Sequence, residues 1–328
     1  MAKNSLFSSV SRGLATVTLL VIAVPASLAS AAGFFGRGWW LFDVLASFRP
    51  QFFVILLLAG IAYGTLVSWT GGGIFLVMAA ANAFVLAPLF FGSPATAEGV
   101  ERLEIITFNV QADARNRVEV MAWLEDNPAD VVVLVESSIE WEEAARRADL
   151  PYEIYAGPLP DRSFGITVLA LDARNVESHD IDGDQIVQFT VDFPGHGSVT
   201  ILAIHPQAPV TPAAAEANEL LLVATGTMAA QVEGSVVVVG DLNTTPWSAR
   251  YRDLMKRGQL ESSSTGFGIQ PTWPANIGVA SIPIDHLLHS ADLTTTDREV
   301  GPDLGSDHYP VIIRLAPAAD EIDAANRP

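Results

Sequence analysis

Five polar residues stand at or just after the ends of apolar runs that are typical of buried strands. They are Asn109 after LEIITF, Glu136 after VVVLV, His205 after SVTILAI, and Asp241 and Asn243 after VVVVG. Because ligands of open α/β sheets bind beyond the carboxyl ends of strands, we expect these side chains to gather at one edge. Each has an ordinary alternative explanation, since acids, amides and glycines also mark simple turns.

Two further segments place a carboxylate near a histidine. Asp307 and His308 precede the run YPVIIRL, and Asp285 lies inside the run IPIDHLLH. A buried carboxylate without a partner is costly, so Asp285 would need a histidine such as His308 beside it. That pairing would fix the tautomer of the ring and raise its basicity. The alternative is an edge strand that leaves Asp285 in water.

The residue types favour a metal site with oxygen ligands. A strand-end carboxylate such as Glu136 suits Mg²⁺, which keeps several waters and takes one or two protein carboxylates. Mn²⁺ also suits oxygen ligands, so both ions stay open. The chain has no cysteine, which excludes disulfides, thiolate metal sites and a cysteine nucleophile.

Alternating strands and helices must position these residues. We expect strands at 103–110, 131–136, 164–171, 186–193, 198–205, 235–241, 282–289 and 308–315, and helices at 117–127, 213–230 and 249–257. Helices mixed with hairpin-like strand pairs favour a two-sheet α/β sandwich over a simple doubly wound sheet.

The first 97 residues have a different character from the rest. Apolar stretches at 13–32, 51–69 and 73–91 each approach the roughly 20 residues that a helix needs to cross a membrane. We expect a turn at 70–73 between the last two. The first stretch has the alternative of a signal peptide, but its length and the two further spans favour a retained helix.

Charge gives an expected orientation for these spans. Lys3 and Arg12 precede the first stretch, which favours a cytoplasmic amino terminus and, with three spans, an extracytoplasmic remainder. Arg37 and Arg49 lie in the first loop and weaken the contrast between the two sides.

The remainder of the chain is strongly acidic. The chain has 18 Lys+Arg and 37 Asp+Glu, and residues 1–97 hold only four of the former and one of the latter. The other 14 basic and 36 acidic residues give residues 98–328 a formal net charge of −22. Nucleic-acid binding usually leaves a basic footprint, so this balance disfavours DNA or RNA as a partner.

In this order, the motifs resemble those of the endonuclease/exonuclease/phosphatase superfamily. The matching strings are TFNV, VVLVE, GDLN, IDH and SDHYPV, spread over residues 103–315. The chain looks like a bacterial branch with amino-terminal membrane helices, in which a further Asn, here Asn116, follows TFNV. The resemblance implies a DNase I-like four-layer α/β sandwich of two mixed β-sheets flanked by helices, preceded by about three transmembrane helices.

This resemblance and the composition together predict a division of the chain into three parts. We expect a membrane anchor over 1–97, the endonuclease/exonuclease/phosphatase domain over 98–316, and a disordered tail over 317–328, which is rich in Ala, Asp and Pro. The chain would then be a multi-pass protein of a bacterial cell membrane, with its catalytic domain outside the cytoplasm.

The resemblance also implies ligands and substrate contacts. Glu136, with Asn109 and Asp307, would hold Mg²⁺ against a phosphate oxygen. Arg162 and Trp273 would contact the substrate, although a surface turn is the ordinary reading of both segments. Many members have Gln before the metal-binding Glu, where this chain has Val135.

Catalytic roles are implied for five residues. Asp241 would orient and deprotonate the attacking water, and Asn243 would hydrogen-bond the phosphoryl oxygens. His308, paired with Asp285, would stabilise the charge of the transition state. His205 matches the position of a second phosphate-contacting histidine in some members. Such reactions need charge neutralisation and positioning more than a covalent nucleophile.

The implied activity is hydrolysis of a phosphoester of a small molecule or lipid by a membrane-anchored, divalent-metal-dependent phosphodiesterase or phosphatase. One alternative is a DNA or RNA nuclease of the same fold. The other is a catalytically silent binding module, and the full set of catalytic residue types argues against it, because clustered carboxylates cost stability.

Overall fold

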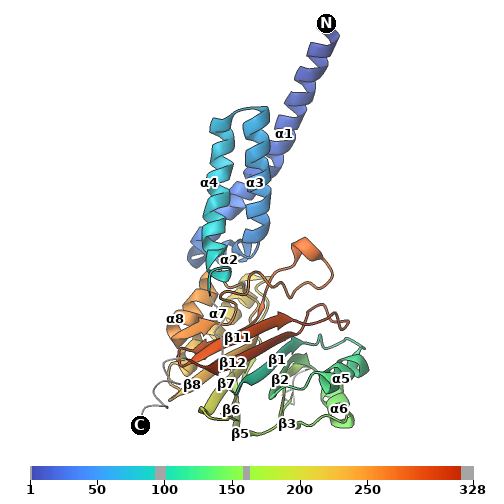
Figure 1. Cartoon of the computed structure of the whole chain (residues 1–328), viewed down its shortest axis with the longest axis vertical. Helices are drawn as coiled ribbons and strands as arrows, with labels where there is room; N and C mark the ends of the chain where they lie inside the picture. The colour runs from blue at the N-terminus through green and yellow to red at the C-terminus, as the bar shows by residue number, and fades with distance from the viewer. Residues whose placement is uncertain (1, 93–100, 158–162, 319–328) are drawn as a thin grey trace. The chain divides into compact units, whose positions relative to one another are not determined.

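The computed structural model describes residues 2–92, 101–157 and 163–318 (Figure 1). They form two compact units. Of these residues, the first unit takes 2–88 and 247–249, and the second takes 89–92, 101–157, 163–246 and 250–318.

Helices make up the amino-terminal unit, drawn in blue to cyan in Figure 1. Its elements are α1 (Ala2–Ala32), η1 (Gly33–Gly38), α2 (Trp40–Ala46), α3 (Arg49–Leu66), α4 (Trp69–Leu86) and η2, which extends from Ala87 to Leu89. Within the described residues, three stretches are long and apolar enough to cross a membrane: Gly13–Gly38, Arg49–Leu66 and Trp69–Leu89. The three predicted apolar spans are thereby confirmed, with ends that differ by a few residues.

The turn predicted at residues 70–73 is wrong, because these residues form the first turn of α4. The chain reverses before them, at Val67 and Ser68. Of the glycines here, Gly72 serves close packing between α3 and α4. A Cβ on Gly72 would lie 2.5 Å from the carbonyl oxygen of Gly60, whereas one on Gly73 would meet nothing within 4 Å. Such small residues let apolar helices approach closely.

A buried polar cluster joins the three apolar helices. The guanidinium of Arg49 donates to the carbonyl of Gly33 at 2.9 Å and to Asn82 Oδ1 at 3.3 Å. The amide of Asn82 donates to Ser30 Oγ at 2.7 Å. Side-chain hydrogen bonds of this kind hold helices together where water is scarce.

Two six-stranded sheets form the second unit. Sheet A has the order β11-β12-β1-β2-β4-β3 and sheet B the order β5-β6-β7-β8-β10-β9. In sheet A the strands are β1 (Leu103–Asn109), β2 (Val131–Ser137), β3 (Glu153–Ala156), β4 (Gly165–Ala170), β11 (Leu293–Val300) and β12 (Val311–Pro317). In sheet B they are β5 (Ala173–Ile181), β6 (Asp184–Phe193), β7 (Gly197–Ile204), β8 (Ser235–Asp241), β9 (Leu260–Ser262) and β10 (Asp285–Ser290). The pairs β1–β2 and β7–β8 are parallel and the others antiparallel, so both sheets are mixed.

An apolar core lies between the two sheets, with Val133 and Val239 among its fully buried members. On the other face of sheet A, α5 (Arg117–Asp126) and α6 (Ile139–Arg147) enclose a second core. On the other face of sheet B, α7 (Pro212–Ala229) and α8 (Ala249–Gly258) enclose a third. The predicted four-layer sandwich is therefore confirmed, because helices cover the outer face of each sheet.

All eight predicted strands and three predicted helices of this unit are present, and the remaining elements were not anticipated. These are β3, β5, β9, β11, α6 and the short 3-10 helix η3 (Gly278–Ala280). The last strand reaches Pro317, which the sequence places in the tail. Of the predicted tail, residues 319–328 lie outside the described residues.

Candidate active site

The polar residues predicted at strand ends do meet at one edge of the sandwich. Asn109 ends β1 and Asp241 ends β8, while His205 directly follows β7. Sheet A thus supplies Asn109 and sheet B supplies the other two. The site is therefore assembled from both sheets.

Glu136 stands at an irregularity in β2. The pairing of β2 with β4 shifts register between Val135 and Ser137, and Glu136 has a φ of 52°. Such a left-handed conformation is unfavourable for a residue with a side chain and is retained mostly at functional sites. A bulge of this kind re-aims a side chain. The bulge between Val135 and Ser137 therefore directs the Glu136 carboxylate into the site.

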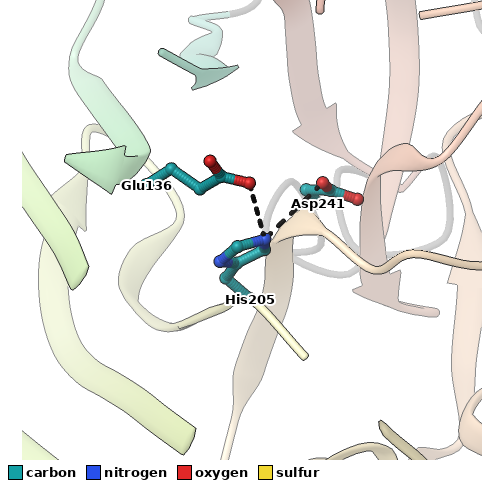
Figure 2. Close-up of side chains that lie close together, drawn as sticks. All are labelled: Glu136, His205 and Asp241. Atoms are coloured by element: carbon teal, nitrogen blue, oxygen red, sulfur yellow. Dashed lines mark ion pairs between the residues drawn. The ribbon is translucent and has the colours of Figure 1, made fainter. Parts of the chain in front are cut away.

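Two carboxylates approach one imidazole nitrogen. The Nε2 atom of His205 lies 3.5 Å from Glu136 Oε1 and 3.7 Å from Asp241 Oδ2 (Figure 2). Asn109 bridges the same two acids, since its Nδ2 donates to Glu136 Oε1 at 2.9 Å and to Asp241 Oδ2 at 3.0 Å. The amide oxygen of Asn109 accepts from the backbone N–H of Gln111.

The predicted pair of Asp285 and His308 is confirmed. His308 Nδ1 lies 2.9 Å from Asp285 Oδ2, and both side chains are buried. His308 Nε2 faces the other way, 3.7 Å from Asp241 Oδ2. His308 lies in the loop before β12 rather than in the strand itself.

Burial and neighbouring charges shift the pKa values of these groups. Desolvation and the charge of Asp285 raise the pKa of Asp241 to about 6, against the opposing effects of His308 and His205. Burial disfavours a charged His308, but the carboxylates of Asp285 and Asp241 outweigh it and raise its pKa to about 10. Burial likewise opposes ionisation of Asp285, yet the charge and hydrogen bond of His308 keep its pKa below the ordinary value. At neutral pH, His308 is a cation between two carboxylates.

A pocket of about 680 Å³ opens over these groups. Its lining includes Glu136, His205, Asp241, Asn243, Asp307, His308 and Trp273, together with Phe164, Gln185 and Val210. The indole Nε1 of Trp273 donates to Asp307 Oδ2 at 3.0 Å. The carboxylate of Asp307 therefore lines the pocket but is engaged by Trp273.

Two groups of side chains have the geometry to hold a metal ion. One comprises Glu136, His205 and Asp241, and the other Asp241, Asp285 and His308. In each group the candidate ligand atoms lie within 4.8 Å of one another. Asp307 belongs to neither group, and the ligand roles of Glu136, Asn109 and Asp307 stay predictions.

The other predicted site residues have mixed outcomes. Asn243 reaches the pocket with a φ of 50°, but its Nδ2 donates to the carbonyl of Pro206 at 3.0 Å. Its backbone N–H donates to Asp241 Oδ1 at 2.8 Å, which orients that carboxylate. Arg162 lies outside the described residues.

Some residues that support the site were not predicted. Ser306 Oγ donates to the carbonyl of Asn109 and accepts from the N–H of His308, which ties the last loop to β1. Thr272 Oγ1 accepts from the backbone N–H groups of Ile284 and Asp285. Serine and threonine in loops are too common for their types alone to indicate such roles.

The fold and the site together define the class of protein. It is a four-layer α/β sandwich whose cleft, at one edge of the sheets, is lined by carboxylates and histidines. The family model for the Endonuclease/Exonuclease/phosphatase family matches residues 106–308, and the chain belongs to this family. Its members are hydrolases that act on phosphoesters. No curated protein matches the chain significantly in sequence.

Solved structures of the same fold share little sequence with this chain. The D. rerio TDP2 complex with a single-strand DNA product matches with a TM-score of 0.56 and 15% identity, over 65% of this chain and 98% of that one. A Bacteroides vulgatus endonuclease/exonuclease/phosphatase matches with a TM-score of 0.54 and 16% identity, over 66% and 99%. One from Beutenbergia cavernae matches with a TM-score of 0.51 and 18% identity, over 66% and 72%. At these identities the likeness shows the fold alone.

Proposed function

We propose that this chain is a membrane-anchored phosphodiesterase or phosphatase that uses a divalent metal ion to hydrolyse a phosphoester of a small molecule or lipid. The observation that carries the proposal is the convergence of Glu136 and Asp241 on one histidine nitrogen, with the buried His308–Asp285 pair behind Asp241. Family membership supports the class of reaction.

The residues at this edge fit a hard divalent cation. Glu136 and Asp241 bring two carboxylates close together, and such an arrangement favours a cation among them. Glu136 would hold Mg²⁺ or Mn²⁺, with Asn109 and Asp307 as further ligands within the same cleft. When bound, the ion supplies charge neutralisation at a phosphate oxygen.

Asp241 is placed to act on water. Its Oδ1 is held by the N–H of Asn243, while its Oδ2 faces both His205 and His308. With a pKa of about 6, Asp241 is mostly ionised at neutral pH and still basic enough to accept a proton at Oδ2. The water oxygen then attacks phosphorus and the ester oxygen departs.

The histidines face the charge that develops in this step. His308 is protonated at neutral pH, and its Nε2–H points toward the space beside Asp241, where it would hydrogen-bond a phosphoryl oxygen. His205 would contact the phosphate from the β7 side. Asn243 would add an amide donor once its bond to Pro206 is released. These groups stabilise charge without forming a covalent bond to the substrate.

The pocket lining supports a small or lipid ester over a polynucleotide. Among its described residues there is no Lys or Arg, whereas Phe164, Val210 and Trp273 give apolar surface and Gln185 and Gln207 give amides. Polynucleotide binding depends on cationic contacts to successive phosphates. A single phosphate held by the metal and histidines needs none.

We place the protein in a bacterial cell membrane, as a multi-pass protein with the catalytic domain outside the cytoplasm. Three stretches of sufficient length and apolar character support the anchor. Lys3 and Arg12 before the first stretch support the orientation. Protease added to intact cells should cleave the domain, and protection until lysis would reverse the orientation.

The test of activity uses the full chain purified in detergent. Its substrates are a para-nitrophenyl diester, the matching monoester, plasmid DNA and sphingomyelin or another phospholipid, each with EDTA or with added Mg²⁺ or Mn²⁺. We expect metal-dependent turnover of an ester or lipid and intact DNA. Nicking of DNA would instead support the nuclease, and turnover that persists in EDTA would refute the role of the metal.

A further inference from the structure

A buried guanidinium lies behind the His308–Asp285 pair. Arg298 is on β11 of sheet A and is only 3% exposed. Its Nη2 donates to the backbone carbonyl of Asp285 at 3.0 Å, and its Nε donates to Ser263 Oγ at 3.3 Å. Its Nη1 donates to Gln270 Oε1, and the amide of Gln270 donates back to the carbonyl of Arg298. Arg298 therefore connects an edge strand of sheet A to the first residue of β10 in sheet B.

The Arg298 guanidinium is a buried cation whose hydrogen-bond partners among the described residues carry no charge. Burial lowers the pKa of Arg298 to about 10, partly offset by Tyr251 and Asp285, so the group is still a cation at neutral pH. Among the described residues, its hydrogen-bond partners are all neutral groups: a backbone carbonyl, a hydroxyl and an amide. Burying a cation without a bonded carboxylate is costly, so a stability role alone explains it poorly.

The contacts of Asp285 indicate what Arg298 does. The backbone N–H of Asp285 donates to Thr272 Oγ1 at 3.3 Å, and its carbonyl accepts from Arg298. Across the sheet, Asp285 pairs in register with Asp241. With its backbone held on both sides, the Asp285 carboxylate has a fixed direction toward His308 Nδ1.

We propose that Arg298 is a positioning residue that acts through Asp285 and His308 on the reaction at Asp241. This inference rests on the proposed function. The fork of the guanidinium matters because it reaches three acceptors at once, which a lysine ammonium on a flexible stem does not reproduce. Arg298 thus holds the backbone of Asp285, the Asp285 carboxylate holds His308 Nδ1, and His308 Nε2 faces Asp241 in the pocket.

The test compares Arg298→Met and Arg298→Lys with wild type in the full chain, using a para-nitrophenyl diester with Mg²⁺. We expect kcat to fall about 100-fold in Arg298→Met, as for other small misplacements of a catalytic group, with KM changed by less than about threefold. Arg298→Lys keeps the charge but loses the fork, so it should recover only part of kcat. Equal kcat in folded Arg298→Met and wild type would overturn the proposal.

A double-mutant cycle separates positioning from general stability. If Arg298 acts through Asp285, adding Arg298→Met to Asp285→Asn should change kcat by less than about threefold. An undiminished additional loss would overturn the proposal. Arg314→Met is the matched control: Arg314 is on β12 of the same sheet and bonds Glu104 at 2.8 Å, so its loss should lower the melting temperature and leave kcat unchanged.

A readout without turnover keeps this inference separate from the proposed function. The proton between His308 Nδ1 and Asp285 should give a low-field NMR resonance that disappears in Asp285→Asn. Arg298→Lys, and Arg298→Met if it folds, should shift or broaden that resonance, while Arg314→Met should leave it in place. An unchanged resonance in the Arg298 variants would refute positioning even if no substrate is turned over.

Discussion

The Nδ1 atom of His308 lies 2.9 Å from Oδ2 of Asp285, and no more than 4% of either residue is exposed to solvent. The hydrogen bond directs the opposite nitrogen, Nε2, toward Asp241. The ring is thereby fixed in both tautomer and direction before any substrate arrives, which lowers the reorganisation needed in the transition state.

Replacing Asp285 with Asn should change the pH profile as well as the rate. The carboxylate helps raise the pKa of His308 to about 10, so the cation should persist to high pH in wild type and be lost at lower pH in the variant. We expect kcat to fall on the order of 100-fold and its alkaline limb to move to lower pH. The control is Asp292→Asn, which removes the carboxylate near His196 and should leave the profile unchanged.

Asp241→Asn should abolish the acidic limb of the same profile. Asp241 loses its proton near pH 6, so activity should rise through that region in wild type. Without a proton acceptor, kcat should fall by about 10²- to 10⁴-fold. Exposed Asp149→Asn serves as the matched control. Unchanged metal-dependent turnover in Asp241→Asn would show that another group activates the water.

Glu136→Gln should weaken metal binding. The carboxylate is the predicted ligand and converges with His205 and Asp241, so a neutral amide should raise the Kd for Mn²⁺ by more than about tenfold. Electron paramagnetic resonance of free Mn²⁺ measures this directly, without substrate. Glu143→Gln, on the exposed face of α6, should bind as wild type does. Equal affinities for both variants would remove Glu136 from the metal site.

His286 should make the fold sensitive to acid. Burial, with the charge of Arg298, lowers its pKa to about 3, while its Nε2 is bonded to the carbonyl of Thr244. The folded state therefore binds fewer protons than the unfolded state between about pH 6.5 and 3, and stability falls there as pH falls, by up to about 1.4 kcal/mol per unit.

The comparison variant for this effect is His286→Gln, which keeps a donor but does not titrate. Urea unfolding of both proteins, followed at several pH values between about 7 and 4, should give a shallower decline for the variant. Parallel declines would mean that His286 does not contribute to acid sensitivity.

Gly72→Ile should disturb the amino-terminal unit. The Cβ of any larger residue would lie 2.5 Å from the carbonyl oxygen of Gly60, so α3 and α4 would have to separate. Gly73→Ile introduces the same side chain one position along, where a Cβ meets nothing within 4 Å. We expect only Gly72→Ile to lower the thermal unfolding midpoint in detergent micelles, and equal midpoints would argue against close packing of these helices.

The sequence allowed the sandwich and most of the site to be predicted because apolar runs and strand-end polar residues are local signals. Asn109, Glu136 and Asp241 each followed a valine- or isoleucine-rich run, and the structure brings all three together. The strand β5 escaped prediction because exposed and charged residues interrupt its pattern.

Other features depend on contacts between distant segments and left no local signal. Arg298 lies in a segment for which the sequence predicted no strand, and only the structure shows it buried against Asp285. The bond between Asp307 and Trp273 joins residues 34 positions apart. The glycines at 71–73 favoured a turn, because the packing of Gly72 against α3 cannot be predicted from the local sequence.

The apolar layer between the sheets has a consequence for the chemistry. Glu136 comes from sheet A and Asp241 from sheet B, and buried apolar side chains such as Val133 and Val239 fill the space between the two sheets. The distance between the proposed metal-binding carboxylate and the proposed water-activating carboxylate therefore depends on this apolar layer as well as on the hydrogen bonds of Asn109 to both. Thinning that layer by a methyl group or two would alter the distance between them, so catalysis should respond to packing changes too small to unfold the protein.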